Sequence, residues 1–195
     1  MARPRSVGED DLIARLAGVF GEAGYHGASL AQLAEAAGLR KASLYHRFPG
    51  GKEQMAAEVL AAVLGRFGNE VIAPLTDSGA PPRSRLARVV PALDALYSGG
   101  RKSCLLNMLS SPRTGDGPFS PAIRAAFAVL IDAFARLATD AGHAPEAAQR
   151  RARRVVALMQ GSLVVSRGSG SDEPFREFLR QLPGDLIARK KEPTP

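Results

Sequence analysis

Apolar side chains recur every three or four residues along most of the chain, which is the spacing of amphipathic helices. Such stripes fall in residues 10–23, 52–73, 83–97, 103–109, 121–141, 146–165 and 174–189. Segments rich in Gly, Pro, Ser and Asp separate the stripes, and no apolar–polar alternation is long enough to predict a β-strand. The pattern therefore predicts an all-α fold.

Glycine and proline predict where these helices end. Gly24 follows the first stripe and is expected to stop that helix, because glycine is a frequent terminator. Pro74 is expected to end the long helix that starts near Lys52, since proline has no backbone N–H to continue the hydrogen bonding. A loop is expected at residues 167–173, where Gly and Ser are dense.

A second pattern, at residues 29–48, predicts two short helices joined by a tight turn. Ser29 and Gln32 form a capping-box pattern at the start of the first helix. Gly38 follows that helix, where a residue that tolerates positive φ is commonly needed. The second helix turns Leu44 inward and leaves polar and basic residues on its other face. This arrangement is typical of a helix-turn-helix, whose second helix enters the major groove of DNA.

Linked motifs extend this pattern on both sides of the turn. They are L-A-E-A-A-G at Leu33–Gly38, L-Y-H-R-F at Leu44–Phe48 and the pair Lys52-Glu53. In this order and spacing, over about residues 12–64, they resemble the TetR/AcrR family of bacterial transcriptional regulators. The longer F-P-G-G-K-E form is similar to the LmrA/YxaF-like subgroup. One departure is Arg40, which stands where the family usually has a serine that caps the recognition helix.

The resemblance implies two domains and a mode of regulation. Residues 1–51 would form a three-helix DNA-binding head, and residues 52–195 a ligand-binding and dimerisation body, with about nine helices in all. A homodimer would bind double-stranded, palindromic operator DNA as a repressor. A small hydrophobic effector would bind in the body and release the DNA by favouring another conformation. Activation, or binding that needs no ligand, is the alternative within this class.

The resemblance also implies which side chains contact DNA. Tyr45 would meet a phosphate, Lys41 a phosphate or a guanine, and Ala42 a thymine methyl group. Ser29 is an N-cap, and it also lies where free backbone N–H groups favour a phosphate. The full set is Ser29, Arg40, Lys41, Ala42, Ser43, Tyr45, His46 and Lys52. Arg3 and Arg5 form either a basic arm that contacts DNA or a solvated tail.

The net charge of +7 does not locate the DNA-binding segment. Residues 1–67 carry eight Lys and Arg against seven Asp and Glu, whereas the remaining residues carry eighteen against twelve. The support is local instead, because four basic residues fall between positions 40 and 52 without an acidic one. Charge therefore adds to the motif only within this short stretch.

The last two long helices resemble the pair that forms the dimer interface in the family. Candidate interface residues are Val155, Val156, Met159, Leu163, Phe175, Phe178, Leu179 and Leu182. Each belongs either to that interface or to the core of one subunit. Four arginines of the first of these helices are interpreted as a solvated face: Arg150, Arg151, Arg153 and Arg154.

Candidate lining of the effector pocket comes from apolar and flexible side chains of the body. They are Tyr97, Cys104, Leu105, Met108, Phe127, Phe134 and Met159, and plain core is the alternative for each. Cys104 is the sole cysteine. It is either a sensor of oxidants, activated by Arg101 and Lys102, or a buried structural thiol.

Other classes of function find little support. The three histidines show no metal-ligand spacing, and neither a nucleophile elbow nor a phosphate loop occurs. We therefore expect no enzymatic activity, metal or cofactor. The sequence has no run of 18 apolar residues and no signal peptide, and one cysteine suits a reducing compartment, so a cytoplasmic protein without a membrane partner is expected. A helical small-molecule or lipid-binding module without operator binding is the alternative from another class.

Overall fold

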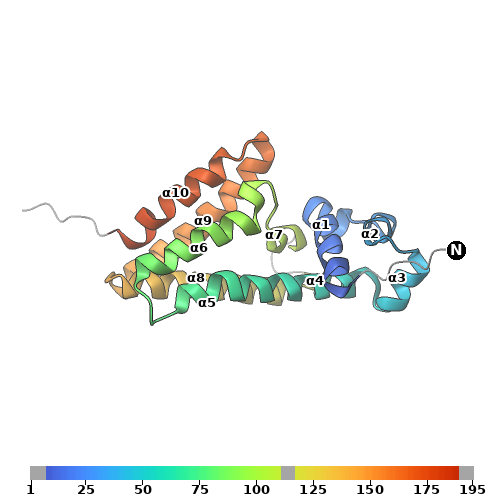
Figure 1. The fold of residues 1–195 in the computed structure, drawn as a ribbon, viewed down its shortest axis with the longest axis horizontal. Helices are drawn as coiled ribbons and strands as arrows, with labels where there is room; N and C mark the ends of the chain where they lie inside the picture. Colours follow the sequence, from blue (N-terminus) through green and yellow to red (C-terminus); the bar gives the residue numbers. More distant parts are fainter. Residues whose placement is uncertain (1–7, 111–116, 189–195) are drawn as a thin grey trace, which may run out of the picture. The chain divides into compact units, whose positions relative to one another are not determined.

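The computed structural model describes residues 8–110 and 117–188, and the ordered elements in these ranges are all helical (Figure 1). The prediction of an all-α fold is confirmed. The elements are α1 (Glu9–Gly27), α2 (Leu30–Ala37), α3 (Lys41–Arg47), α4 (Gly51–Phe67), η1 (Gly68–Ile72), α5 (Ala73–Thr76), α6 (Pro82–Leu96), η2 (Ser98–Gly100), α7 (Leu105–Leu109), α8 (Ser120–Asp140), α9 (Pro145–Ser169) and α10 (Glu173–Ile187). Because α4, η1 and α5 follow one another without a break, the described residues form nine separate α-helices.

These helices form two compact units. Among the described residues, the first unit comprises residues 8–65, 104–110 and 117–123, and the second comprises residues 66–103 and 124–188. The first unit thus takes in α7 and the start of α8 besides the helices of the expected head. The functional division into residues 1–51 and 52–195 stays a prediction.

The core of the first unit is built from one face of each of its helices. Phe20 of α1, Leu33 of α2, Leu44 of α3 and Met55 of α4 are all buried. Phe48, directly after α3, is fully buried as well. Because each helix contributes apolar residues at helical spacing, this core fixes which face of α3 points outward.

Gly24 kinks α1 and does not end it, so the expectation of a stop at this residue was wrong. Its φ of 70° and ψ of 176° are non-helical, yet the helix resumes and runs to Gly27. The close approach of α7 explains the glycine, because a Cβ here would lie only 3.0 Å from the carbonyl oxygen of Met108. Gly24 therefore serves two needs at once, a backbone conformation with positive φ and room for a neighbouring backbone.

Pro74 likewise does not end its helix, contrary to expectation. The chain makes a wider π-turn at Gly68–Ile72 and then continues as α5, with Pro74 in the first turn of α5. The amide of Ala73 donates to the carbonyl of Gly68, five residues back. The wider turn accommodates a residue that has no N–H and a bulky ring. By length and composition alone this helix, Gly51–Thr76, could cross a membrane, a property shared by many core helices of soluble proteins.

In the second unit, a buried arginine joins α6 to its neighbours. The side chain of Arg85 is 4% exposed, and its Nη1 lies 2.6 Å from Oδ2 of Asp140 at the end of α8. Its Nε donates to the carbonyl of Ala80 at 2.6 Å, and Nη1 also donates to the carbonyl of Leu75 at 3.4 Å. One guanidinium group thus satisfies two carbonyls and a carboxylate, as a buried cation requires.

The last helix, α10, packs against α9 and α6 within the same unit (Figure 1). Phe175 at its start is fully buried and meets the ring of Tyr97 edge-on, with the ring centroids 5.6 Å apart. Gly100 lies directly beneath Phe175, because a Cβ there would come within 2.6 Å of the Cβ of Phe175. Helix α9 runs to Ser169, four residues beyond the expected end, and stops at Gly170 with a φ of 66°.

Candidate DNA-binding site

The turn between α2 and α3 is formed as the sequence predicts. The side chain of Ser29 accepts a hydrogen bond from the amide of Gln32 at 3.2 Å, and the amide of Ser29 donates to the side chain of Gln32 at 2.9 Å. This completes the capping box at the start of α2. Gly38 ends α2 with a φ of 65°, and its N–H donates to the carbonyls of Ala34 and Glu35. Two local signals therefore fix where α2 begins and where the chain turns.

Helix α3 starts without a side-chain cap. Arg40 holds the N-cap position in an extended conformation, and its side chain makes no capping hydrogen bond. The helix is instead held by the buried side chains of Leu44 and Phe48. Because packing replaces the cap, the departure from the family pattern at Arg40 leaves an exposed guanidinium group at the start of the helix.

The outer face of α3 carries most of the side chains that were expected to contact DNA. Lys41, Ala42, Ser43, Tyr45 and His46 are all exposed, and Tyr45 is one of few large apolar side chains in the described residues with this much accessible surface, at 45%. An ideal Cβ on Gly51 would lie 3.7 Å from the ring of Tyr45, so this ring rests beside the first turn of α4. The face therefore offers donors, acceptors and methyl groups on one short helix, as base and phosphate recognition requires.

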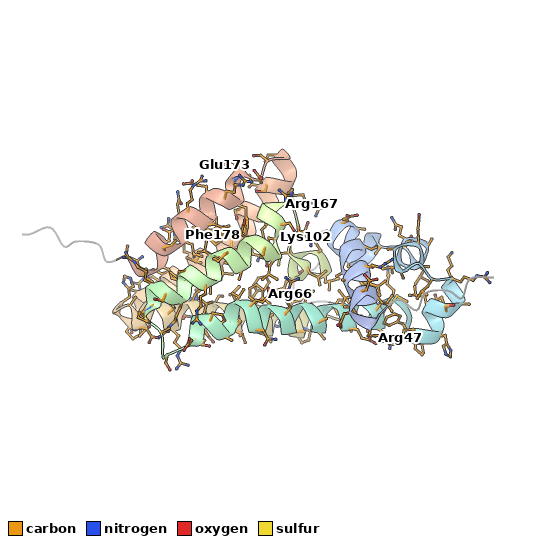
Figure 2. All side chains as sticks on the ribbon, in the orientation of Figure 1. Arg47, Arg66, Lys102, Arg167, Glu173 and Phe178 are labelled. Carbon is orange, nitrogen blue, oxygen red and sulfur yellow. The ribbon has the colours of Figure 1, made fainter. Side chains whose placement is uncertain are left out.

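Arg47 belongs to the same helix but does not share its outer face. Figure 2 labels Arg47 among the helices of the first unit. Its guanidinium group contacts two carboxylates, that of Glu9 on α1 and that of Glu58 on α4. Nε donates to Glu9 at 3.1 Å, and Nη2 donates to Glu58 at 2.7 Å. The same group lies over the ring of Phe48, 4.4 Å from its centroid. Although the sequence places Arg47 in the local basic cluster, the structure uses it to tie α3 to α1 and α4.

The contacts between Arg47 and the carboxylates shift the pKa values of these groups. Hydrogen bonding to Glu9, and then to Glu58, raises the pKa of Arg47, so the side chain stays charged. The hydrogen bond from Arg47 in turn lowers the pKa of Glu58. Gln54 extends the network, since its side chain donates to Glu58 and accepts from the amide of Gly50, each at 2.8 Å. Gly50, in the link that follows α3, is thereby connected through Gln54 to the carboxylate that Arg47 of α3 contacts.

Lys52 lies at the start of α4 and is half-buried. Its ammonium group donates to the carbonyl of Ala28 at 3.1 Å and sits 4.8 Å from the centroid of the Tyr25 ring. A lysine has three donors, so this bond leaves two for a phosphate. Ser29 is exposed and caps α2. Its second expected role, a contact with a DNA phosphate, stays a prediction. Arg3 and Arg5 lie outside the described residues.

The candidate residues for an effector pocket are spread over both compact units. Cys104, Leu105 and Met108 belong to the first unit, and the other four, Tyr97, Phe127, Phe134 and Met159, belong to the second. All are buried except Met108 and Phe127, which are half-buried. Two surface hollows of the second unit are lined by other residues. The effector set therefore stays a prediction.

The candidate dimer residues all lie in the core of one chain. The eight side chains on α9 and α10 are no more than 8% exposed. The outward face of α9 carries other apolar residues that the sequence reasoning missed, namely Leu158, Val164 and Val165, which are 39–54% exposed. The missed signal was a second apolar stripe on α9. Positions 158 and 165 are seven residues apart, which is about two helical turns, so they share one side of the helix.

Comparison with known proteins agrees with this geometry. Residues 12–59 match the model of the bacterial regulatory proteins of the tetR family, and residues 92–181 match the C-terminal domain of LmrA/YxaF-like transcriptional regulators. The chain is 25% identical over 171 residues to the helix-turn-helix transcriptional regulator YxaF of Bacillus subtilis (strain 168). That alignment covers 86% of this chain and 88% of the relative. YxaF and LmrA, a second relative from the same organism that is also 25% identical over 171 residues, are both named as helix-turn-helix transcriptional regulators.

Solved structures share the fold over almost the whole chain. A TetR regulator from Legionella pneumophila superposes with a TM-score of 0.78 at 19% identity, covering 94% of this chain and all of that one. The regulator CifR, as a cysteine mutant complexed with 26-base-pair operator DNA, gives a TM-score of 0.68 at 28% identity and covers 95% of this chain and 99% of that one. With both domain models matched and the helix-turn-helix formed, the chain belongs to the TetR family of bacterial transcriptional regulators, with a C-terminal domain of the LmrA/YxaF-like kind.

Proposed function

We propose that the protein is a cytoplasmic repressor that binds a palindromic operator as a homodimer and leaves it when a small hydrophobic effector binds. The observation that carries the proposal is the outer face of α3. Its exposed side chains stand on a helix whose other face is buried, and whose position is tied to α1 and α4 through Arg47. The complex of CifR with operator DNA supports the same use of this fold.

In this proposal the exposed residues of α3 make three kinds of contact with the DNA. Tyr45 and Lys41 donate to phosphates or base edges, Ser43 and His46 offer short polar contacts, and Ala42 meets a thymine methyl group. Arg40 and Lys52 add charge at the two helix N-termini, with Ser29 beside them. Each phosphate contact should add to the salt dependence of binding, because bound cations release counterions from the DNA.

The homodimer follows from the size of the head and the symmetry of such operators. One helix-turn-helix reads only a half-site, and two heads related by a two-fold axis read two half-sites about one DNA turn apart. For the dimer face we infer that Leu158, Val164 and Val165 contribute, because they are apolar, exposed and lie on one long helix. The eight buried candidates would support this face from beneath.

Fluorescence anisotropy with the promoter DNA beside the gene tests operator binding. We expect that fragment to bind more tightly than bulk DNA at physiological salt. Tyr45→Ala and Lys41→Ala should each weaken binding by about 1–3 kcal/mol, or, for a pure phosphate contact, lower the salt slope by about one.

Lys102→Ala is the matched control, since it removes an exposed cation that lies outside the candidate set. Size-exclusion chromatography with light scattering checks that the variants keep the assembly of the wild type. If no promoter fragment binds more tightly than bulk DNA, the repressor proposal is wrong. That result would favour a small-molecule-binding module without operator binding.

A further inference from the structure

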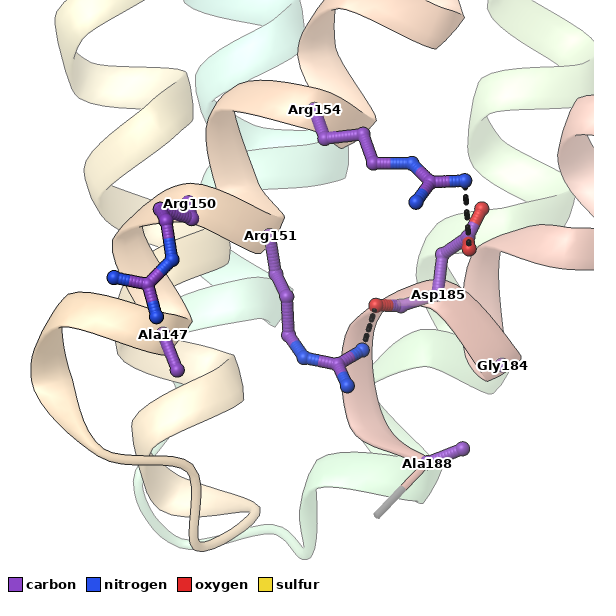
Figure 3. Close-up of a pocket in the computed structure, with 7 residues that line it drawn as sticks. All are labelled: Ala147, Arg150, Arg151, Arg154, Gly184, Asp185 and Ala188. Carbon is purple, nitrogen blue, oxygen red and sulfur yellow. Dashed lines mark hydrogen bonds and ion pairs between the residues drawn. The ribbon is translucent and has the colours of Figure 1, made fainter. Parts of the chain in front are cut away.

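A hollow of about 520 Å³ lies on the second unit where the start of α9 meets the end of α10 (Figure 3). Three arginines of α9 line it, Arg150, Arg151 and Arg154, together with Asp185 of α10. The lining thus holds three cations and one carboxylate. From the sequence these arginines were interpreted as a solvated face. The structure instead places all three around a hollow.

Two of the three guanidinium groups contact the same residue. Arg151 donates to the backbone carbonyl of Asp185, and Nη2 of Arg154 lies 3.8 Å from Oδ1 of its carboxylate. Figure 3 shows both side chains reaching from α9 toward Asp185 across the hollow. Each guanidinium group has five N–H donors, so one contact to Asp185 leaves most of the donors of each group available to a ligand.

The rest of the lining is small. Ala147, Gly184 and Ala188 carry at most a methyl group, and a Cβ built on Gly184 would meet no atom within 4 Å. The space between the arginines is therefore open. A second hollow of about 410 Å³ shares Arg150 with this one, and its lining adds one cation, Arg153, and one carboxylate, Glu146.

These features favour a particular class of ligand. Guanidinium forks bind carboxylates and phosphates through paired hydrogen bonds, and such bonds are shorter and stronger than neutral ones. A volume of this size falls in the range of small-molecule sites and exceeds what a single inorganic ion fills. The hydrogen-bonded guanidinium group of Arg151, with the exposed groups of Arg154 and Arg150 beside it, matches a ligand that carries two or more anionic groups.

We propose that this hollow is a binding site for a small polyanion bearing carboxylate or phosphate groups. The ligand bridges Arg151 and Arg154, and Arg150 closes the site at its rim. This proposal does not rest on the proposed function, because all of the residues lie in the second unit and the binding measurement needs no DNA. It gives the body a charged ligand of a different chemical kind from the proposed hydrophobic effector.

Isothermal titration calorimetry with citrate and with pyrophosphate, at one fixed ionic strength, tests the site. Citrate presents carboxylates and pyrophosphate presents phosphates, so the two probes distinguish the sources of the anionic groups. We expect saturable binding of at least one probe, with one site per chain. Arg154→Gln should weaken that binding roughly tenfold, since it removes a charge-assisted contact.

Two further variants separate a built site from general attraction. Arg153→Gln is the matched control, because it removes the same charge from the same helix but from outside the hollow, and it should change affinity less than about twofold. Gly184→Leu keeps every charge and fills the open space, so it should abolish binding, with circular dichroism confirming that it is folded. The proposal is overturned if neither probe binds saturably, or if Arg153→Gln weakens binding as much as Arg154→Gln does.

Discussion

Two arginines hold helices together in this molecule, and their surroundings differ. Arg85 in the second unit is 4% exposed and meets one carboxylate and two backbone carbonyls. Arg47 in the first unit is 37% exposed and meets two carboxylates on two different helices. The first is enclosed by protein, whereas water reaches the second.

The difference in burial decides what each arginine contributes. Breaking a buried ion pair leaves polar groups without partners in a medium of low dielectric, which is costly. An ion pair that water can reach is screened, and its Coulomb energy is largely offset by the solvation it replaces. Arg85 should therefore govern stability, while Arg47 should govern where α3 sits.

Arg85→Ala should have the largest effect of the changes considered. It removes the cation beside Asp140 and leaves the carbonyls of Leu75 and Ala80 without their donor. We expect a loss of about 3 kcal/mol in the free energy of unfolding, at the lower end for a buried pair because Asp140 is 34% exposed. For a chain of this size, that loss corresponds to a melting temperature lower by about 6–12 °C, measured by calorimetry.

Arg83→Ala provides the control for this change. Arg83 lies on the same helix and is exposed, so its removal should alter the free energy of unfolding by no more than about 0.5 kcal/mol. Equal melting temperatures for the two variants would mean that burial does not set the contribution of Arg85.

Arg47→Met should act on DNA binding more than on stability. The change keeps the length of the side chain and removes the fork that joins α3 to Glu9 and Glu58. Because α3 then loses its fixed place, operator affinity should fall roughly threefold to thirtyfold, which anisotropy titrations would measure.

Arg66→Met is the comparison for Arg47. The partner of Arg66 is Glu70, four residues along the same chain segment, so this pair joins no separate helices. Operator affinity should stay within about twofold of the wild type. If Arg47→Met binds the operator as tightly as the wild type does, α3 does not depend on this tie.

The smallest expected effect is a dependence on acid. Hydrogen bonding from Arg47 lowers the pKa of Glu58 below its ordinary value of 4.5. A lowered pKa means that the stabilisation is fully present above that ordinary value and is lost as the pH falls through the folded-state pKa. Carboxyl chemical shifts from NMR should place the titration of Glu58 at lower pH in the wild type than in Arg47→Met. Identical titrations would mean that the contact is too weakly populated to matter.

Local signals in the sequence were sufficient for the turn of the DNA-binding site. The capping box at Ser29 and the positive φ at Gly38 depend on neighbours only a few residues away, so motif and structure agree. The outward face of α3 also followed from the inward position of Leu44. Each of these features is decided within about one helical turn.

Features that depend on distant residues could not be predicted in this way. Gly24 looks like a helix stop until the carbonyl of Met108 is placed beside it. Arg47 looks like one member of a basic cluster until Glu9, 38 residues earlier, is known to reach it. The same limit applies to α9, where the sequence shows apolar residues but not which of them face the core. The spacing of apolar residues predicts which side of a helix is apolar. What that side contacts depends on how the helices pack, which the spacing does not give.

The burial of Cys104 has a practical consequence. It is the sole cysteine of the chain, and it is 4% exposed at the N-cap of α7. A cysteine introduced at an exposed position such as Gly184 would therefore be the most accessible thiol in the molecule, without any prior substitution. Because a bound polyanion would cover that thiol, slower attachment of a maleimide dye in the presence of the ligand would report that the arginine-lined hollow is occupied.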